Sequence, residues 1–325
     1  MTAPPSLEPL RGSRCVVTGG AGLVGSHIVG QLVAAGAGQV VVLDLFGPGM
    51  AEEMAQDMAG APVRVEEADL RDAGAVRAAT SGADYVFHQA ALALRPCQDQ
   101  PRRAVEVNVV GTFNVLEAAV EAGVGKVVAA SSSSVYGEAL YLPTDEAHPF
   151  NTDLFYGATK VAGEQLLRCF HKAYGLAYVA LRYLNIYGPH RAYGPANVDV
   201  FGHFARRIEA GEPPRIDGDG SATMDLVYVG DAARANLLAA VADVEAEVLN
   251  IASGRETTVR ELAETMVRVY GRPDLAPECT PRDSKLVARR WGTADRAREV
   301  LGFEAEVDLE EGLRRIVEFR AAMAG

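Results

Sequence analysis

The stretch Val16-Val17-Thr18-Gly19-Gly20-Ala21-Gly22-Leu23-Val24-Gly25-Ser26-His27 decides the fold of this chain. An apolar strand pattern runs into glycines spaced three apart, Gly19, Gly22 and Gly25, and a helix pattern follows. In such a unit the first glycine forms the tight turn, the second lets backbone approach a pyrophosphate, and the third lets helix pack on strand. The N-terminus of the helix then faces the phosphates. We therefore predict a dinucleotide-binding turn, with Leu23 and Val24 at the start of the helix among the cofactor contacts.

An acidic residue after the second strand narrows the choice of cofactor. The apolar run Val40-Val41-Val42-Leu43 ends at Asp44, 19 residues past Gly25. A carboxylate at this place accepts hydrogen bonds from a ribose 2′-hydroxyl and would repel a 2′-phosphate. A tight turn alone would explain the glycines but not Asp44, so the sequence predicts NAD rather than NADP.

Composition excludes several classes of partner. The 325 residues are 49% hydrophobic, which is enough for a large core, and the length favours two lobes of one unit. The formal net charge is −12, from 31 basic and 43 acidic side chains. Because nucleic acids and anionic membranes repel such a surface, we expect neither as a partner.

Cysteine usage and hydropathy favour a cytoplasmic protein. Cys15, Cys97, Cys169 and Cys279 show no spacing typical of a metal site, so we expect reduced, inert or buried thiols and no metal. No apolar run approaches the length of a membrane span, and residues 1–9 lack the pattern of a secretory signal.

The order of apolar segments predicts an α/β fold with a Rossmann-type, doubly wound parallel sheet. Strand patterns occur at 14–18, 39–44, 63–66, 84–87, 126–131 and 177–182, and helix patterns at 23–36, 50–59, 73–81, 101–122 and 154–174. Beyond about residue 185, glycine and proline punctuate short segments. We expect an NAD-binding domain at 1–185, with 225–250 returning to it, and a smaller C-terminal substrate-binding lobe at 186–325.

A tyrosine and a lysine lie four residues apart in Tyr156-Gly157-Ala158-Thr159-Lys160, so they share one face of a helix. A nearby ammonium stabilises a phenolate, and we therefore expect a lowered pKa that lets Tyr156 act as a base. The run Ser131-Ser132-Ser133-Ser134 ends the strand at 126–131. Ligands bind at this end of parallel strands, so a hydroxyl there could bridge substrate and tyrosine.

With these residues in place, the chain resembles the extended short-chain dehydrogenase/reductase family, in particular its nucleotide-sugar 4-epimerases. The resemblance covers almost the whole chain and includes the glycine turn, Asp44, Asp69-Leu70, His88 to Ala91, Asn108 to Thr112, the serine run, Tyr156 to Lys160, Leu181 to Pro189, and Gly218 to Ser221.

The resemblance implies a role for each matching residue. Tyr156 is the expected catalytic base and acid, Lys160 holds the nicotinamide ribose, and Ser132 occupies the catalytic Ser/Thr position. The expected cofactor contacts further include Asp69 and Leu70 at the adenine, and Gln89, Ala90, Ala91, Asn108, Ser131 and Tyr183. The expected substrate contacts are Leu92, Ser132, Ser133, Asn185 and Lys285.

The resemblance also orders the possible reactions. Dehydratases of the family carry an Asp-Glu pair where this chain has Ser133 and Ser134, and decarboxylases carry a glutamate at the place of Ser134. Without them, the expected fate of the 4-keto intermediate is return of the hydride to its other face, which inverts C4. The substrate would be a UDP-hexose or UDP-hexuronate. Another NAD-linked change of a nucleotide sugar (decarboxylation, dehydration or reduction) and a non-catalytic NAD(H)-sensing protein remain alternatives.

The substrate side departs from the family pattern at one position. Relatives usually have a diphosphate-binding arginine where this chain has Met224. Compensation could come from Arg282, Lys285, Arg289 or Arg290, although such a cluster can also be a solvated surface. A homodimer is expected through helices 101–122 and 154–174, the second with Val161, Leu166, Leu167 and Phe170 on its outer side.

Overall fold

Seven parallel strands form the central sheet of the computed structural model, which describes residues 4–47, 49–189, 200–281 and 289–324. Their spatial order is β3-β2-β1-β4-β5-β6-β10. The strands are β1 (Arg14–Thr18), β2 (Gln39–Asp44), β3 (Val63–Glu67), β4 (Tyr85–His88), β5 (Lys126–Ser132), β6 (Tyr178–Tyr183) and β10 (Ala246–Ile251). The first six lie within one residue of their expected bounds, so the doubly wound sheet is confirmed. β10 was not predicted as a strand; it adds to the edge beside β6.

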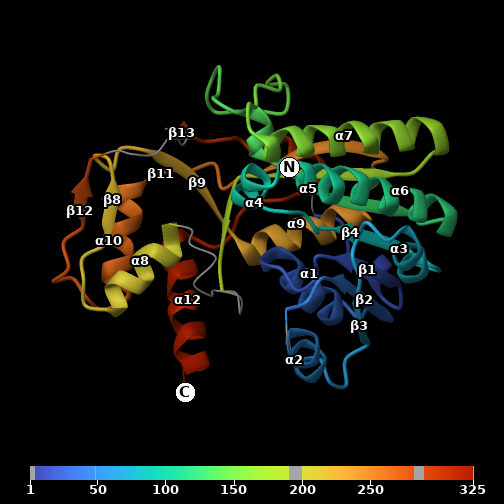
Figure 1. Ribbon diagram of the computed structural model, residues 1–325, viewed down its shortest axis with the longest axis horizontal. Coiled ribbons are helices and arrows are strands. Elements are labelled where there is room, and N and C mark those ends of the chain that lie inside the picture. The colour runs from blue at the N-terminus through green and yellow to red at the C-terminus, as the bar shows by residue number, and fades with distance from the viewer. Residues whose placement is uncertain (1–3, 48, 190–199, 282–288, 325) are drawn as a thin grey trace.

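Helices cover both faces of this sheet (Figure 1). α1 (Leu23–Ala34) and α9 (Val229–Val241) pack together on one face, and α3 (Ala73–Thr80), α6 (Gly111–Ala122) and α7 (Phe155–Tyr174) lie on the other. Successive strand side chains point to opposite faces, so each strand must be apolar on both sides. Val17 and Val42 accordingly join the core under α1 and α9, and Val16 and Val41 the core under α3 and α6.

A smaller sheet forms the second lobe, on the left of Figure 1. β9 (Thr223–Tyr228) pairs with β7 (Asn185–Tyr187), β11 (Glu256–Thr258) and β13 (Arg289–Arg290). β8 (Arg215–Asp217) pairs with β12 (Glu278–Thr280). An apolar core joins this sheet to α8 (Val200–Glu209), α10 (Val259–Val269) and α12 (Leu309–Ala324).

The chain returns from the small lobe to the large one at the junction of Tyr228 and Val229. Of the segment 225–250, the residues before Val229 end β9 in the small sheet, whereas α9 and β10 belong to the large lobe. α11 (Asp295–Leu301) then packs against β10 and α9.

Short elements complete the structure: η1 (Glu8–Leu10), α2 (Met50–Asp57), α4 (Leu94–Asp99), α5 (Pro101–Val105), η2 (Glu106–Val110) and η3 (Ser133–Tyr136). The helix expected at 101–122 is therefore interrupted by a π-helical turn, η2, between α5 and α6. Of the helices in the described ranges, none combines the length and apolarity that crossing a membrane requires.

The outer side of α7 differs from the expectation. Leu167 and Phe170 are buried in the core beneath the helix rather than exposed. This happens because α7 packs on both β5 and α6, so a wide arc of its surface is covered. The large apolar side chains that α7 exposes are Phe155 and Tyr174 near its two ends.

The glycine turn joins β1 to α1 with almost no space between backbone segments. Gly19 has a left-handed φ of +68°, and a Cβ there would lie 2.6 Å from the backbone nitrogen of Ala90. A Cβ on Gly25 would overlap the carbonyl oxygen of Gly19. The first and third glycines are thus required by the fold itself.

We predict that Gly25→Ala lowers the free energy of unfolding by about 1–3 kcal/mol, because the methyl group overpacks the turn. Gly30→Ala, on the same helix, is the control: a Cβ at Gly30 meets nothing within 4 Å. Its better helix propensity should raise stability by roughly 1 kcal/mol. Urea unfolding curves measure both; equal effects of the two substitutions would contradict the steric account.

Candidate active site

The catalytic candidates meet where β5 ends and α7 begins. Tyr156 and Lys160 lie one turn apart on α7, and Ser132 is the last residue of β5. The Ser132 side chain is near enough to the Tyr156 phenol to lower its pKa. The Lys160 ammonium donates to the carbonyl oxygen of Ala130 at 2.8 Å and lies 5.6 Å from the centre of the Tyr156 ring. The fold thus brings the three predicted catalytic residues together.

Burial governs the charge states of these groups. It raises the pKa of Tyr156 to about 12, and the nearby Ser132 side chain offsets only part of this rise. It lowers the pKa of Lys160 to about 8. The expectation of a lowered Tyr156 pKa is wrong for this structure, because the cost of desolvating a phenolate is the largest influence on that pKa. Tyr156 is therefore a neutral phenol at neutral pH.

Ser131 and Ser132 point to opposite sides, as consecutive strand residues do. The Ser131 hydroxyl donates to the Glu164 carboxylate at 2.5 Å. Glu164 and Arg182 form a buried ion pair, with two hydrogen bonds of 2.8 and 2.9 Å. The side chain of Ser131, expected at the cofactor, is part of this buried cluster.

The dinucleotide end of the site lies at the glycine turn. The Asp44 carboxylate accepts hydrogen bonds from the backbone N–H groups of Ala21 at 2.9 Å and Leu45 at 2.7 Å. The acid predicted to bind ribose thus sits against the turn predicted to bind pyrophosphate. α1 starts directly after Gly22, so its free N–H groups face the same place. This cradle, which added Cβ atoms would fill, fits a dinucleotide.

Asp69 and Leu70 follow β3, the edge strand that pairs with β2. Asp69 accepts several hydrogen bonds from Arg71, which lower the pKa of its carboxyl. Leu70 is buried against Gly111, where a Cβ would come within 2.9 Å of the Leu70 side chain. Both side chains are therefore held in place by contacts within the protein.

The side chains of Tyr183, Gln89 and Asn236 form a hydrogen-bonded group. The Tyr183 hydroxyl donates to Gln89 at 3.0 Å and accepts from the Asn236 amide at 2.7 Å. Gln89 in turn donates to Asn236 at 3.0 Å. Asn236 did not appear among the predicted residues. The signal available in the sequence was an asparagine within the alanine-rich stretch 232–240, and the structure buries it fully.

Asn108 links two parts of the site. Its side chain accepts from the backbone N–H of Leu92 at 2.7 Å and donates to the hydroxyl of Thr159 at 3.1 Å. The π-helical turn η2 aims this side chain inward. The loop that carries Ala90, Ala91 and Leu92 is thereby tied to α7.

His88, another residue absent from the predicted site, ends β4 directly before this loop. Its two ring nitrogens are bonded to the hydroxyls of Thr18 and Thr112, at 2.8 and 2.9 Å. Burial lowers the pKa of His88 to about 3, so the ring is neutral.

The substrate candidates are less tightly grouped. Ser133 begins η3, next to Ser132, and the hydroxyl of Ser134 accepts a hydrogen bond from Ser132 at 3.0 Å. Asn185 starts β7, and its amide donates to the backbone carbonyl of Asp225 at 2.9 Å. Lys285 lies outside the described residues, as does Arg282.

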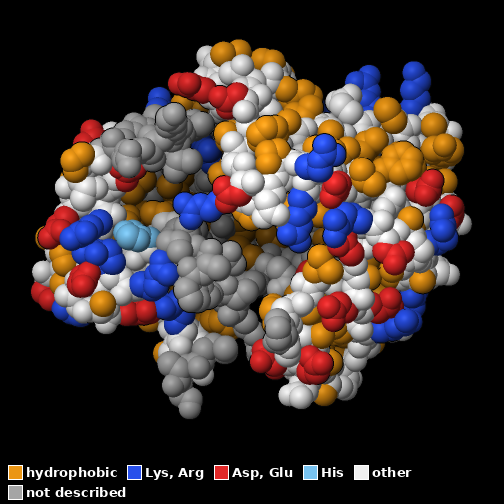
Figure 2. Space-filling view, viewed as in Figure 1, with side chains coloured by type: hydrophobic (Ala, Val, Ile, Leu, Met, Phe, Trp, Pro, Cys, Tyr) orange, Lys and Arg blue, Asp and Glu red, His pale blue; other side chains and the backbone are white. Residues whose placement is uncertain are grey.

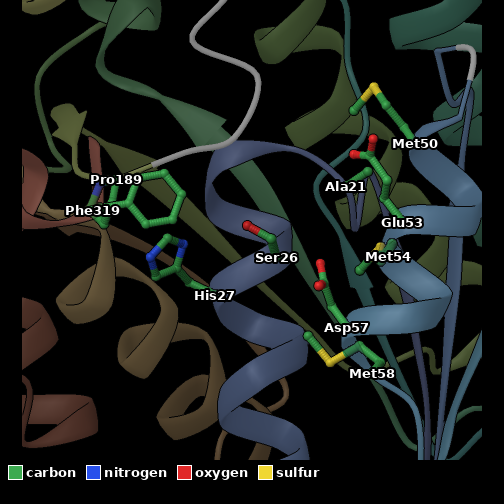
Figure 3. A pocket seen from close by; sticks show the side chains of 10 residues that line it. All are labelled: Ala21, Ser26, His27, Met50, Glu53, Met54, Asp57, Met58, Pro189 and Phe319. Atoms are coloured by element: carbon green, nitrogen blue, oxygen red, sulfur yellow. The ribbon is translucent and has the colours of Figure 1, made fainter. Parts of the chain in front are cut away.

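A cavity of about 300 Å³ lies beside the turn, between α1 and α2 (Figure 3). Ala21, Ser26 and His27 line it, together with three methionines, Met50 and Met54 on α2 and Met58 directly after it. Ser132, Tyr156 and Lys160 do not line it, so it is separate from the catalytic groups.

Comparison with known proteins agrees with this geometry. Residues 15–252 match the model of the NAD-dependent epimerase/dehydratase family. A UDP-glucose 4-epimerase of Mycolicibacterium smegmatis is 38% identical over 310 residues, 94% of this chain and 98% of that protein. The structure of a UDP-glucose 4-epimerase from Thermotoga maritima with UDP-glucose superposes with a TM-score of 0.88 at 34% identity, covering 96% of this chain and 100% of that one.

Relatives with another reaction are also similar. The structure of a dTDP-glucose 4,6-dehydratase from Streptomyces venezuelae, solved with NAD bound, superposes with a TM-score of 0.85 at 29% identity. The match covers 95% of this chain and 97% of that one. The family is thus clear while its members differ in chemistry. This chain belongs to the NAD-dependent epimerase/dehydratase family and is an NAD-dependent enzyme of nucleotide sugars.

Proposed function

We propose that the chain inverts C4 of a nucleotide sugar, a UDP-hexose or UDP-hexuronate, through a transient 4-keto intermediate. One observation carries the proposal: the Ser132 side chain lies by the Tyr156 phenol beside Lys160, and the two residues after Ser132 carry hydroxyls rather than carboxyls. The site thus has the groups needed to remove and return a hydroxyl proton, and no further acid or base at positions 133 and 134.

Each catalytic residue has a part in this chemistry. The Tyr156 oxygen takes the proton of the sugar 4-hydroxyl, and Ser132 bridges that hydroxyl to the phenol. Lys160, held by the carbonyl of Ala130, keeps a positive charge close to the developing phenolate. Bound NAD supplies the hydride acceptor and donor, and its positive nicotinamide favours the phenolate. Tyr156 then returns the proton when the rotated keto sugar is reduced.

Elimination needs groups that positions 133 and 134 do not offer. A dehydratase must protonate the leaving hydroxyl and remove a proton from C5, and neither Ser133 nor Ser134 can do so at neutral pH. Ser134 moreover accepts a hydrogen bond from Ser132, so its hydroxyl supports the catalytic serine.

We predict that the protein converts UDP-glucose or UDP-glucuronate to an equilibrium mixture with the C4 epimer, without net change in NADH. Proton NMR of the sugar H1 and H4 signals follows the reaction, with absorbance at 340 nm recorded in parallel. A 4-keto-6-deoxy product, release of carbon dioxide, or stoichiometric oxidation of NADH would rule out epimerisation.

We predict that Tyr156→Phe lowers kcat by about 10²–10⁴-fold, because the proton has no acceptor. NAD binding should persist, since the glycine turn and Asp44 are untouched. Tyr141→Phe is the matched control: Tyr141 is an exposed phenol bonded to Asp145. Initial rates and chromatography of released nucleotide give the two readouts. Near-normal turnover of Tyr156→Phe would remove the residue from the mechanism.

We also propose that the enzyme is a homodimer joined through its paired helices. Val105, Val110 and Phe113 expose about half of their surface along α5, η2 and α6, and Tyr174 exposes 65% at the end of α7. The buried Phe170 ring contacts both Phe113 and Tyr174, so these two exposed aromatic side chains lie on either side of one ring. Figure 2 shows hydrophobic side chains gathered where α6 and α7 lie. Such a patch is typical of a protein interface.

We predict that light scattering after gel filtration gives the mass of two chains, and that Phe113→Glu gives the mass of one. A carboxylate buried at a two-fold interface faces its own copy and is not compensated. Leu140→Glu, which alters an apolar side chain that is 67% exposed in the loop after η3, should remain dimeric. A monomeric wild-type protein would contradict the proposal.

A further inference from the structure

The missing arginine at position 224 has a neighbour that can take its place. In the small sheet, β13 runs parallel to β9, with Arg289 opposite Thr223 and Arg290 opposite Met224. Side chains of directly paired residues lie on the same face of a sheet. The Arg290 side chain therefore emerges next to that of Met224.

Asn185, a substrate candidate, lies on this same face. It pairs with Leu226 of β9, which is two residues from Met224 and so points to the same side. The amide of Asn185 is fixed by its hydrogen bond to Asp225. One face of the small sheet thus carries Arg290, Met224 and Asn185 close together.

The two adjacent arginines differ in what they contact. Arg289, on the opposite face, makes two hydrogen bonds of 2.6 and 2.7 Å to the Glu256 carboxylate. Arg290 is partly buried, and within the described part of the chain no hydrogen bond or ion pair engages its guanidinium. Burial without a nearby carboxylate lowers the pKa of Arg290.

An unpaired charge that is withdrawn from water is costly, so folded proteins usually supply a partner. Here the fold supplies none among the described residues, although Glu256 satisfies the arginine next to it. Such a difference between Arg289 and Arg290 is expected if the anion that pairs with Arg290 belongs to a bound ligand. A guanidinium binds phosphate or carboxylate oxygens with two parallel hydrogen bonds.

We propose that Arg290 binds an anionic group of the nucleotide sugar, either its diphosphate or a carboxylate on the sugar. The inference rests on the proposed function, because it takes a UDP-sugar as the ligand. Arg290 thereby restores on β13 the positive charge that the chain lacks at position 224 of β9, on the same face of the sheet.

The test compares Arg290→Met with Arg289→Met, which removes the same charge from the opposite face. Calorimetry at constant salt gives the Kd of the NAD-loaded protein for UDP, UDP-glucose and UDP-glucuronate. Arg290→Met should weaken binding about 10- to 100-fold. Weakening of all three ligands assigns the diphosphate, and weakening of UDP-glucuronate alone assigns the carboxylate. Arg289→Met should bind as the wild type does.

The double variant Met224→Arg/Arg290→Met keeps the net charge and moves it back to β9. If Arg290 holds the diphosphate, this exchange restores most of the UDP affinity; if it holds the carboxylate, UDP binding never changes and glucuronate binding stays weak. Thermal unfolding checks that each variant folds. Unchanged affinities in Arg290→Met, or equal losses in Arg289→Met, would overturn the assignment. Wild-type protein that bound none of the three ligands would instead contradict the proposed function on which the assignment rests.

Discussion

The contact between Gly25 and the carbonyl oxygen of Gly19 is the constraint on which the other parts of the site depend. Because neither glycine has a side chain, α1 can start directly at the end of β1, and Gly19 can pass close to Ala90 after β4. The turn, the Asp44 carboxylate and the loop carrying Leu92 are thereby brought to one edge of the sheet. A dinucleotide held at this edge would extend toward the end of β5, where Ser132 lies beside the start of α7.

A second theme is the low polarity of the site. Burial raises the pKa of Tyr156 and lowers those of Lys160 and His88, so each group is pushed toward its neutral form. Charges interact more strongly in such surroundings than in water. A cationic cofactor and an anionic substrate would therefore change the pKa of the buried Tyr156 more than they would change the pKa of an exposed tyrosine. In the proposed mechanism, the phenol would acquire its role as a base from its bound ligands and not from the protein alone.

The sequence predicted the features that depend on local pattern: six strands, the glycine turn, and the grouping of Ser132, Tyr156 and Lys160. Features that depend on tertiary packing escaped it. The segment that forms β10 has an ordinary apolar pattern, and it becomes an edge strand because α9 leads the chain back to β6. Asn236 can be recognised as part of the site only from its hydrogen bonds with Gln89 and Tyr183. The Tyr156 pKa was misjudged because helical spacing places the lysine near the ring but does not reveal the cost of burial.

The central claim is that this site borrows a hydride from C4 and returns it to the same carbon. The most direct measurement uses UDP-glucose deuterated at C4, mixed with unlabelled UDP-glucose carrying ¹³C in the sugar, and follows both by mass spectrometry and NMR. The account predicts that the C4 epimer keeps its deuterium and that no deuterium appears in the ¹³C-labelled sugar. Loss of deuterium to solvent, or its transfer to the ¹³C-labelled molecules, would show that the hydride is not returned within one catalytic cycle and would contradict the account.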